Sequence, residues 1–215
     1  MKIETIPQAI NNEAGLYEGD LKYYFKVIFL NAQNRFHPYH NLRHMLHVFW
    51  MCYQACVHYS DSMSPEEKRI LLIASLFHDF DHSGMSGNDD LNIARAIRGL
   101  EKYLLNDDQI YLDEIAKIIK ATEFPYAIPT HQLSHCQKII RDADIAQVFS
   151  VAWIQQVILG LAKEWGKSPI DILKMQEGFL KGINFGTTWA RELFPQEIID
   201  GKIKENREII AILLE

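Results

Sequence analysis

Apolar residues recur at three- and four-residue steps along most of this chain, and this spacing constrains its fold more than any other feature. One such stripe is formed by Leu42, Met45, Phe49, Cys52, Tyr53 and Cys56. That spacing places the side chains on one face of an amphipathic helix. Alternating apolar runs next to Asn-Gly or Asp-Gly, which would indicate β-hairpins, do not occur. We therefore predict an all-α fold.

Capping residues and turn signals divide the chain into helices. Ser64 can cap a helix whose first turn holds Pro65, and this helix is expected to end near Gly84, where Ser-Gly and Gly-Asn steps follow. Without an internal repeat or a Ser/Gly linker, the chain is expected to form one domain, with its first helix as an N-terminal addition. Further helices are predicted over 13–31, 89–105, 108–122, 135–164, 169–183 and 195–214, with turns at 106–108 and 125–129.

The composition indicates a folded protein without a general attraction for polyanions. The chain has 215 residues, of which 48% are hydrophobic and 23% are charged, enough for a packed core and unlike a disordered segment. The 22 basic and 28 acidic residues leave a net charge of -6, and no dense Lys/Arg run is present. Binding to duplex nucleic acid or to an anionic membrane is therefore not expected.

The N-terminal sequence and the cysteines favour a cytoplasmic location. The first ten residues, MKIETIPQAI, lack the basic and then apolar layout of a signal peptide. The longest apolar stretch, Ile70–Phe77, is shorter than the roughly 20 residues of a membrane span. The three cysteines have no paired spacing, which argues against a disulfide framework. Cys52 and Cys56 are interpreted as packing residues.

Histidines are concentrated in one part of the chain. Seven of the nine lie between His37 and His82, where even scatter would place about two. On a helix beginning near Tyr39, His40 and His44 would stack on one face, because they are four residues apart. Such a cluster points to a bound ligand or ion.

A second cluster, His78-Asp79-Phe80-Asp81-His82, follows a strongly apolar segment. An adjacent His and Asp lie ~100° apart on a helix, so both side chains can lean onto one ion, and His82 follows one turn later. A further carboxylate can come from the segment around Asp142 and Asp144. Only one of those two can point into a site, because residues two apart on a helix face in different directions.

Six short segments follow one another from about residue 39 to residue 180. They are Tyr39-His40-Asn41-x-x-His44, His78-Asp79-x-x-His82-x-Gly84, Ala121-Thr122-Glu123, Ala143-Asp144-Ile145, Trp153-x-x-x-Val157 and Gln176-Glu177-Gly178-Phe179. In this order they resemble the HD superfamily of metal-dependent phosphohydrolases, and most closely the catalytic domain of 3',5'-cyclic nucleotide phosphodiesterases. The resemblance selects Asp144 over Asp142 as the last metal ligand.

The resemblance implies a centre of two divalent metal ions. Its first ion, Zn, Fe or Mn, would be bound by two imidazoles and two carboxylates, leaving positions open for water as in a catalytic site. The ligands are His44, His78, Asp79 and Asp144. Asp79 would bridge to a second ion, Mg or Mn, held otherwise mostly by water.

The resemblance also implies a reaction, the hydrolysis of a phosphodiester of a cyclic nucleotide by metal-activated hydroxide. His40 would act as the general acid for the leaving alkoxide, and Glu123 or His82 would orient His40 or the nucleophile. The expected partner is a small nucleotide or phosphoester, since Gln176 can pair with a base edge while Phe179 and Val157 enclose its ring.

By resemblance, the whole of 1–215 is one phosphodiesterase-like helical domain, with its metal-site core at about 37–185 and flanking helices at both ends. The chain departs from the family pattern in shorter connecting segments, in His47 where the family has Asp, and in Gln147 where it has Asn. His37, His47 and Gln147 receive no role.

Two other functions remain open at this stage. One is an HD-type nucleotidase, phosphomonoesterase or alarmone hydrolase, which the shorter connections and Gln147 would suit. The other is a non-enzymatic metal or nucleotide sensor. The oligomeric state is also open, because nothing in the sequence addresses it.

Overall fold

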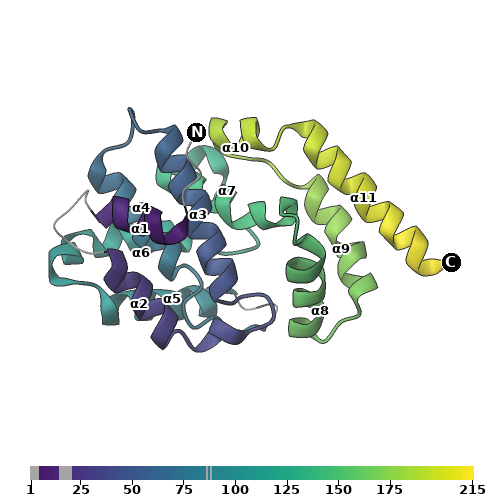
Figure 1. Cartoon of the computed structure of the whole chain (residues 1–215), viewed down its shortest axis with the longest axis horizontal. Helices are drawn as coiled ribbons and strands as arrows, with labels where there is room; N and C mark the ends of the chain where they lie inside the picture. Colours follow the sequence, from purple (N-terminus) through teal and green to yellow (C-terminus); the bar gives the residue numbers. More distant parts are fainter. Residues whose placement is uncertain (1–4, 15–20, 86, 88) are drawn as a thin grey trace.

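Helices joined by short 3-10 segments and turns make up the computed structural model, which describes residues 5–14, 21–85, 87 and 89–215 (Figure 1). Over these residues there is no β-strand, so the predicted all-α fold is confirmed. The α-helices are α1 (Ile6–Ala14), α2 (Leu21–Asn31), α3 (Leu42–His58), α4 (Pro65–Phe77), α5 (Asp89–Tyr103), α6 (Leu112–Lys120), α7 (His135–Ile145), α8 (Leu159–Trp165), α9 (Pro169–Lys181), α10 (Thr188–Leu193) and α11 (Gln196–Leu214).

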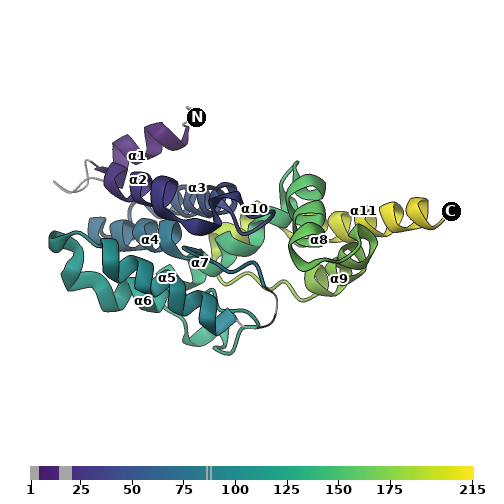
Figure 2. The ribbon, with the colours of Figure 1, turned by 90° about the horizontal axis from the view of Figure 1, so that it is seen from below.

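Helices α1 to α7 gather in one body, and α8, α9 and α11 lie beside it (Figures 1 and 2). Helix α4 is the central helix of the body, because every residue from Arg69 to Phe77 is buried and α3 and α6 pack against it. The three cysteines are buried and form no disulfide, which agrees with the interpretation of Cys52 and Cys56 as packing residues. Helix α11 packs along α9 and then extends away from the body to the C-terminus.

Both helices that carry the histidine clusters are shorter than predicted. Helix α3 begins at Leu42, because the Asn41 side chain caps it by accepting from the backbone N–H groups of Arg43 and His44. The predicted helical stacking of His40 over His44 is therefore wrong. The helix expected to reach Gly84 ends at Phe77, and at Asp81 the backbone adopts a φ of 60°, which no right-handed helix can contain.

The single helix predicted over 135–164 is also wrong. After α7 the chain forms the 3-10 turn η4 (Ala146–Phe149), then the π turn η5 (Ile154–Ile158), and α8 follows in a direction bent by 103°. Ser150 is extended, with a ψ of 152°, which ends the helix. The bend lets Trp153 enter the core of the molecule, whereas Val151 is left fully exposed at the corner.

Elsewhere the boundaries agree more closely. Helices α5, α9 and α11 begin and end within two residues of their predicted limits. The helix predicted over 13–31 is not continuous, since α1 ends at Ala14 and α2 begins at Leu21; residues 15–20 lie outside the described residues. The turn predicted at 106–108 is the start of the 3-10 helix η2 (Asn106–Tyr111), which precedes α6, and the short helix α10 was not predicted.

In the described part of the chain, no single helix combines the length and hydropathy needed to cross a bilayer. By length and composition alone, one bent pair does, His135–Phe149 with Ile154–Trp165.

A buried ion pair joins η2 to the central helix. The guanidinium of Arg69 donates to both carboxylate oxygens of Asp108, at 2.7 and 2.9 Å, and the Tyr24 hydroxyl donates to the same carboxylate. Arg69 and Asp108 are each only 2% exposed. Removing one partner would therefore leave a charge in the core without compensation.

We expect Asp108→Ala to lower the free energy of unfolding by about 3–5 kcal/mol, because Arg69 would lose its buried counter-charge. Urea denaturation followed by circular dichroism measures this loss. The exposed neighbour Asp107 supplies the control, and Asp107→Ala should leave stability near the wild-type value. Equal effects of the two substitutions would contradict the assignment.

Candidate active site

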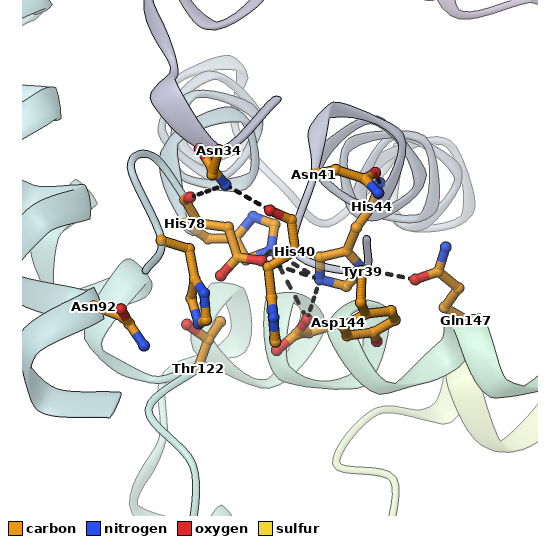
Figure 3. Close-up of polar contacts among 12 residues, drawn as sticks. Asn34, Tyr39, His40, Asn41, His44, His78, Asn92, Thr122, Asp144 and Gln147 are labelled. Atoms are coloured by element: carbon orange, nitrogen blue, oxygen red, sulfur yellow. Dashed lines mark hydrogen bonds and ion pairs between the residues drawn. The ribbon is translucent and has the colours of Figure 1, made fainter. Parts of the chain in front are cut away.

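Four possible ligand atoms from three parts of the chain converge at one point (Figure 3). His44 Nε2, on α3, lies 3.0 Å from Asp144 Oδ1, on α7. It lies 3.4 Å from Asp79 Oδ2 and 3.4 Å from His78 Nε2, both just beyond the end of α4. His78 Nε2 lies 3.5 Å from Asp79 Oδ2 and 3.8 Å from Asp144 Oδ1.

These distances fit the ligand set of a divalent cation. With metal–ligand bonds of about 2.1 Å, neighbouring ligand atoms lie ~3.0 Å apart in an octahedral site and ~3.4 Å apart in a tetrahedral one. The buried Asp79 Oδ2 has no hydrogen-bond donor among the described residues. A cation would supply the charge that this oxygen lacks. The ligand atoms of His44, His78 and Asp79 all lie within 4.8 Å of one another and fit an ion, and Asp144 adjoins this group through His44 and His78.

Hydrogen bonds behind the two imidazoles engage their Nδ1 atoms, so their Nε2 atoms face the two carboxylates. His78 Nδ1 donates to the backbone carbonyl of Ser75 at 2.8 Å, and His44 Nδ1 donates to Gln147 Oε1 at 2.7 Å. A neutral imidazole that donates from Nδ1 keeps its lone pair on Nε2. Both rings are therefore held in the tautomer that a metal ligand needs.

The charges gathered in the cluster shift the pKa values of His44 and Asp79. Burial alone would lower the pKa of His44, but the hydrogen bond to Asp144 and the negative charges of Asp79 and Asp144 outweigh it and raise this pKa to about 9. Burial would likewise raise the pKa of Asp79, yet the surrounding histidines, His78 foremost, hold it well below its usual range. The cluster thus attracts positive charge, whether a proton or a metal ion.

His40 lies beside this cluster and is held by a residue that sequence reasoning missed. Its Nδ1 is bonded to Glu164 Oε1, on α8, while Glu164 Oε2 accepts from the backbone N–H groups of Tyr39 and His40 at 2.8 and 3.1 Å. These bonds outweigh burial and lower the pKa of Glu164, which stays ionised. His40 itself lines the cavity described below. Glu164 is 124 residues away in the mostly apolar helix α8, and no local signal points to it.

His82 stacks on His40, with ring centroids 3.7 Å apart. Its Nδ1 accepts from the backbone N–H of Gly84 at 3.0 Å, and burial lowers its pKa to about 4, so the ring is neutral near pH 7. Glycine is required at position 84, since φ is 74° and a side chain there would meet the ring of His37 and the side chain of Glu164. Glu123, predicted to orient His40 or the nucleophile, is not among the residues that line the cavity.

Asn34 joins the two histidine segments and was not singled out from the sequence. It is fully buried, and its amide donates to the carbonyls of His40 and Asp79, at 2.8 Å each (Figure 3). Its Oδ1 accepts from the backbone N–H of Asp81 at 3.0 Å. One side chain thereby sets the spacing between the proposed acid and the proposed bridging carboxylate.

The converging ligand atoms lie at one end of a cavity of about 730 Å³ between the body and the α8–α9 side. The other end is mainly apolar and contains the three residues predicted to bind a base, Val157, Gln176 and Phe179. Gln176 is 6% exposed, and its buried Oε1 has no partner among the described residues. Phe124 contacts the Phe179 ring edge-on, with centroids 6.3 Å apart. The size suits a drug-sized or nucleotide-sized ligand.

The remaining histidines of the cluster surround the site without entering it. His47 follows His44 by one turn of α3; burial and the charge of His44 lower its pKa to about 4. The ring of His37 lies against Gly84. In the described part of the chain, His37 Nδ1 and His47 Nε2 are buried without a hydrogen-bond partner.

Comparison with known proteins gave one match in sequence and further matches in structure. Residues 39–97 match the sequence model of the family described as 3'5'-cyclic nucleotide phosphodiesterase, a stretch that contains both histidine clusters. Forty-nine chains of solved structures match. One is LmjPDEB1 of Leishmania in complex with IBMX, at 16% identity and a TM-score of 0.61, covering 97% of this chain and 86% of that one. The chain therefore resembles this family over residues 39–97 and shares the fold of that solved structure. Among curated proteins none matches.

The structural match covers 97% of this chain and agrees with the expected helical fold, whereas the family match spans only residues 39–97. His44, Asp79 and Asp144 line the cavity, and His44, His78 and Asp79 form a group that could hold a metal ion.

Proposed function

We propose that this domain hydrolyses a phosphodiester bond of a cyclic nucleotide in the cavity between the body and α8–α9. The observation that carries the proposal is the arrangement of that cavity. Four metal-ligand atoms and His40 meet at one end, and an apolar slot with one buried amide, Gln176, forms the other. A charged phosphodiester and a flat base fit these two ends respectively.

His44, His78, Asp79 and Asp144 would hold the first divalent ion, Zn, Fe or Mn, and Asp79 would be shared with a second, Mg or Mn. When bound, the ions would lower the pKa of a water and neutralise charge on the phosphoryl oxygens. The protein's part is to fix the ligand atoms in advance, through the hydrogen bonds of Ser75 and Gln147 to the two imidazoles.

His40 would supply the proton that the leaving alkoxide needs. Glu164 binds its Nδ1, so a proton on Nε2 points into the cavity, where the phosphodiester would lie. The carboxylate of Glu164 stabilises the imidazolium before the transfer and keeps the ring oriented after it. His82 also supports the His40 ring, because it stacks on one of its faces. For Glu123 we propose no contact with His40.

Gln176 would recognise the base. Its side-chain amide can both donate and accept a hydrogen bond. The buried Oε1 has no donor among the described residues, and the exocyclic or ring N–H of a base would supply one. Val157 and Phe179 line the same end and would contact the faces of the ring. Small-molecule recognition of this kind needs no contact with duplex nucleic acid.

We expect Gln176→Ala to raise KM for a cyclic nucleotide about tenfold, the effect of about 1.4 kcal/mol lost with one buried hydrogen bond. A chromogenic phosphodiester without a base should be hydrolysed at the wild-type rate. Lys174, exposed on the same helix, supplies the control variant Lys174→Ala. A loss that is equal for both substrates would contradict the role in base binding.

The function itself is tested with a panel of substrates and Mn²⁺ or Mg²⁺. Metal-dependent hydrolysis of cAMP or cGMP to the nucleoside monophosphate, without release of inorganic phosphate, is the expected result. Release of phosphate from nucleoside monophosphates, with the cyclic substrates untouched, would favour the phosphomonoesterase instead. If metal binding raised the melting temperature but no substrate were turned over, the proposed enzymatic function would be wrong and a sensor would be favoured.

A further inference from the structure

Two glutamines, Gln147 and Gln156, form a chain of hydrogen bonds behind His44; Figure 3 shows the first of them, Gln147, bonded to His44. Gln147 Oε1 accepts from His44 Nδ1 at 2.7 Å, and Gln147 Nε2 donates to Gln156 Oε1 at 2.5 Å. Gln147 is 2% exposed and belongs to the 3-10 turn η4; Gln156 is half-buried and belongs to the π turn η5. The chain therefore crosses the bend between α7 and α8.

The direction of the Gln147 amide decides which nitrogen of His44 can bind an ion. In the observed direction the carbonyl faces Nδ1, so Nδ1 carries the proton and Nε2 keeps its lone pair. Rotated by 180°, the amide would present its NH₂ group to Nδ1, which would then have to accept. The proton of the neutral ring would move to Nε2, the atom that faces Asp79 and Asp144.

Gln147 has no preference between these directions by itself, because its two ends are nearly equal in shape. The carbonyl of Gln156 supplies the preference, since it accepts from NH₂ and would face another carbonyl if the amide rotated. A buried pair of facing acceptors costs free energy comparable to a lost hydrogen bond. The observed direction is thereby favoured.

We propose that Gln156 is a positioning residue of the metal centre, which holds His44 in its metal-binding tautomer through Gln147. This inference rests on the proposed function in taking His44 as a ligand. It gives Gln147, which departs from the family pattern, a role in this chain. Gln156 also precedes Val157, which lines the base-binding end of the cavity, so the π turn connects the two ends of the site.

The test compares metal affinity among variants, independently of turnover. Binding of Mn²⁺ alone to the metal-depleted chain is measured by electron paramagnetic resonance. Gln147→Leu should raise the Kd by about 10–100-fold, and Gln156→Leu by about tenfold. Gln156→Glu should stay near the wild-type Kd, because a carboxylate is an acceptor only and keeps the Gln147 amide in the same direction.

Matched controls separate orientation from charge and packing. Gln155 is exposed on the same π turn, so Gln155→Leu should bind Mn²⁺ like the wild type, and Gln155→Glu shows the effect of an added charge alone. Gln156→Ala serves if the leucine variant is not folded. Unchanged affinity in Gln156→Leu and Gln156→Ala, or equal weakening in Gln156→Leu and Gln156→Glu, would overturn the positioning role. A wild-type chain that binds no Mn²⁺ would overturn the proposed function as well.

Discussion

Replacing His40 by alanine is expected to lower kcat for a cyclic nucleotide by about 10²–10⁴-fold while Mn²⁺ binding is retained. The alkoxide of a ribose is a poor leaving group and depends on a proton from the cavity side of His40. None of the four converging ligand atoms belongs to His40, so the metal centre should survive. Steady-state kinetics and Mn²⁺ titration of the same preparation measure both effects.

The leaving group provides the sharper criterion. A p-nitrophenyl phosphodiester releases a stable anion without protonation, so His40→Ala should impair its hydrolysis far less than that of the cyclic nucleotide. Glu164→Gln keeps the side chain's shape and should lie between the wild type and His40→Ala, because a neutral partner stabilises the imidazolium less. His131, exposed, provides the control His131→Ala. If His40→Ala lowered the hydrolysis rates of both substrates equally, His40 would not be the general acid.

The second large effect is expected at Asp144. Asp144→Ala should raise the Mn²⁺ Kd by more than the 10–100-fold that is typical of residues behind the ligands, and activity should fall with it. Its carboxylate is the nearest acid to His44 Nε2, at 3.0 Å. The melting temperature without metal should fall only moderately, because the partly exposed carboxylate gives up its contact with His44 and no hydrogen bond to the backbone of the described residues. Calorimetry with and without Mn²⁺ measures both quantities.

Asp142 is the matched control, two residues away on α7. It is buried, and its carboxylate accepts from the backbone N–H groups of Gly186 and Thr187 at 2.8 and 2.9 Å and from the Thr187 hydroxyl at 2.7 Å. Asp142→Ala should therefore lower stability, by about 1–3 kcal/mol for each donor left unpaired, and leave the Mn²⁺ Kd unchanged. If Asp142→Ala weakened metal binding as much as Asp144→Ala, the assignment of the ligand would be wrong.

The sequence alone predicted the all-α class and the residues whose side chains converge at the candidate site. Periodicity is a local property, so α5, α9 and α11 could be read within two residues. Capping is local too, and Ser64 does cap α4 in a full capping box. His44, His78, Asp79 and Asp144 could be selected because their spacing matches a family motif, although residue spacing alone left Asp142 and Asp144 equivalent.

Only the tertiary structure showed which other side chains form hydrogen bonds that hold the site residues in place. Glu164 reaches His40 across 124 positions of sequence, Asn34 bonds to the segments of both His40 and Asp79, and Gln156 reaches Gln147 only because the chain bends by 103° between α7 and α8. The sequence predicted that bend as straight helix, since apolar spacing continues through it. A helical period records which face of a segment is buried. The partner that each polar side chain meets depends on how separate helices pack, and only the folded chain determines that.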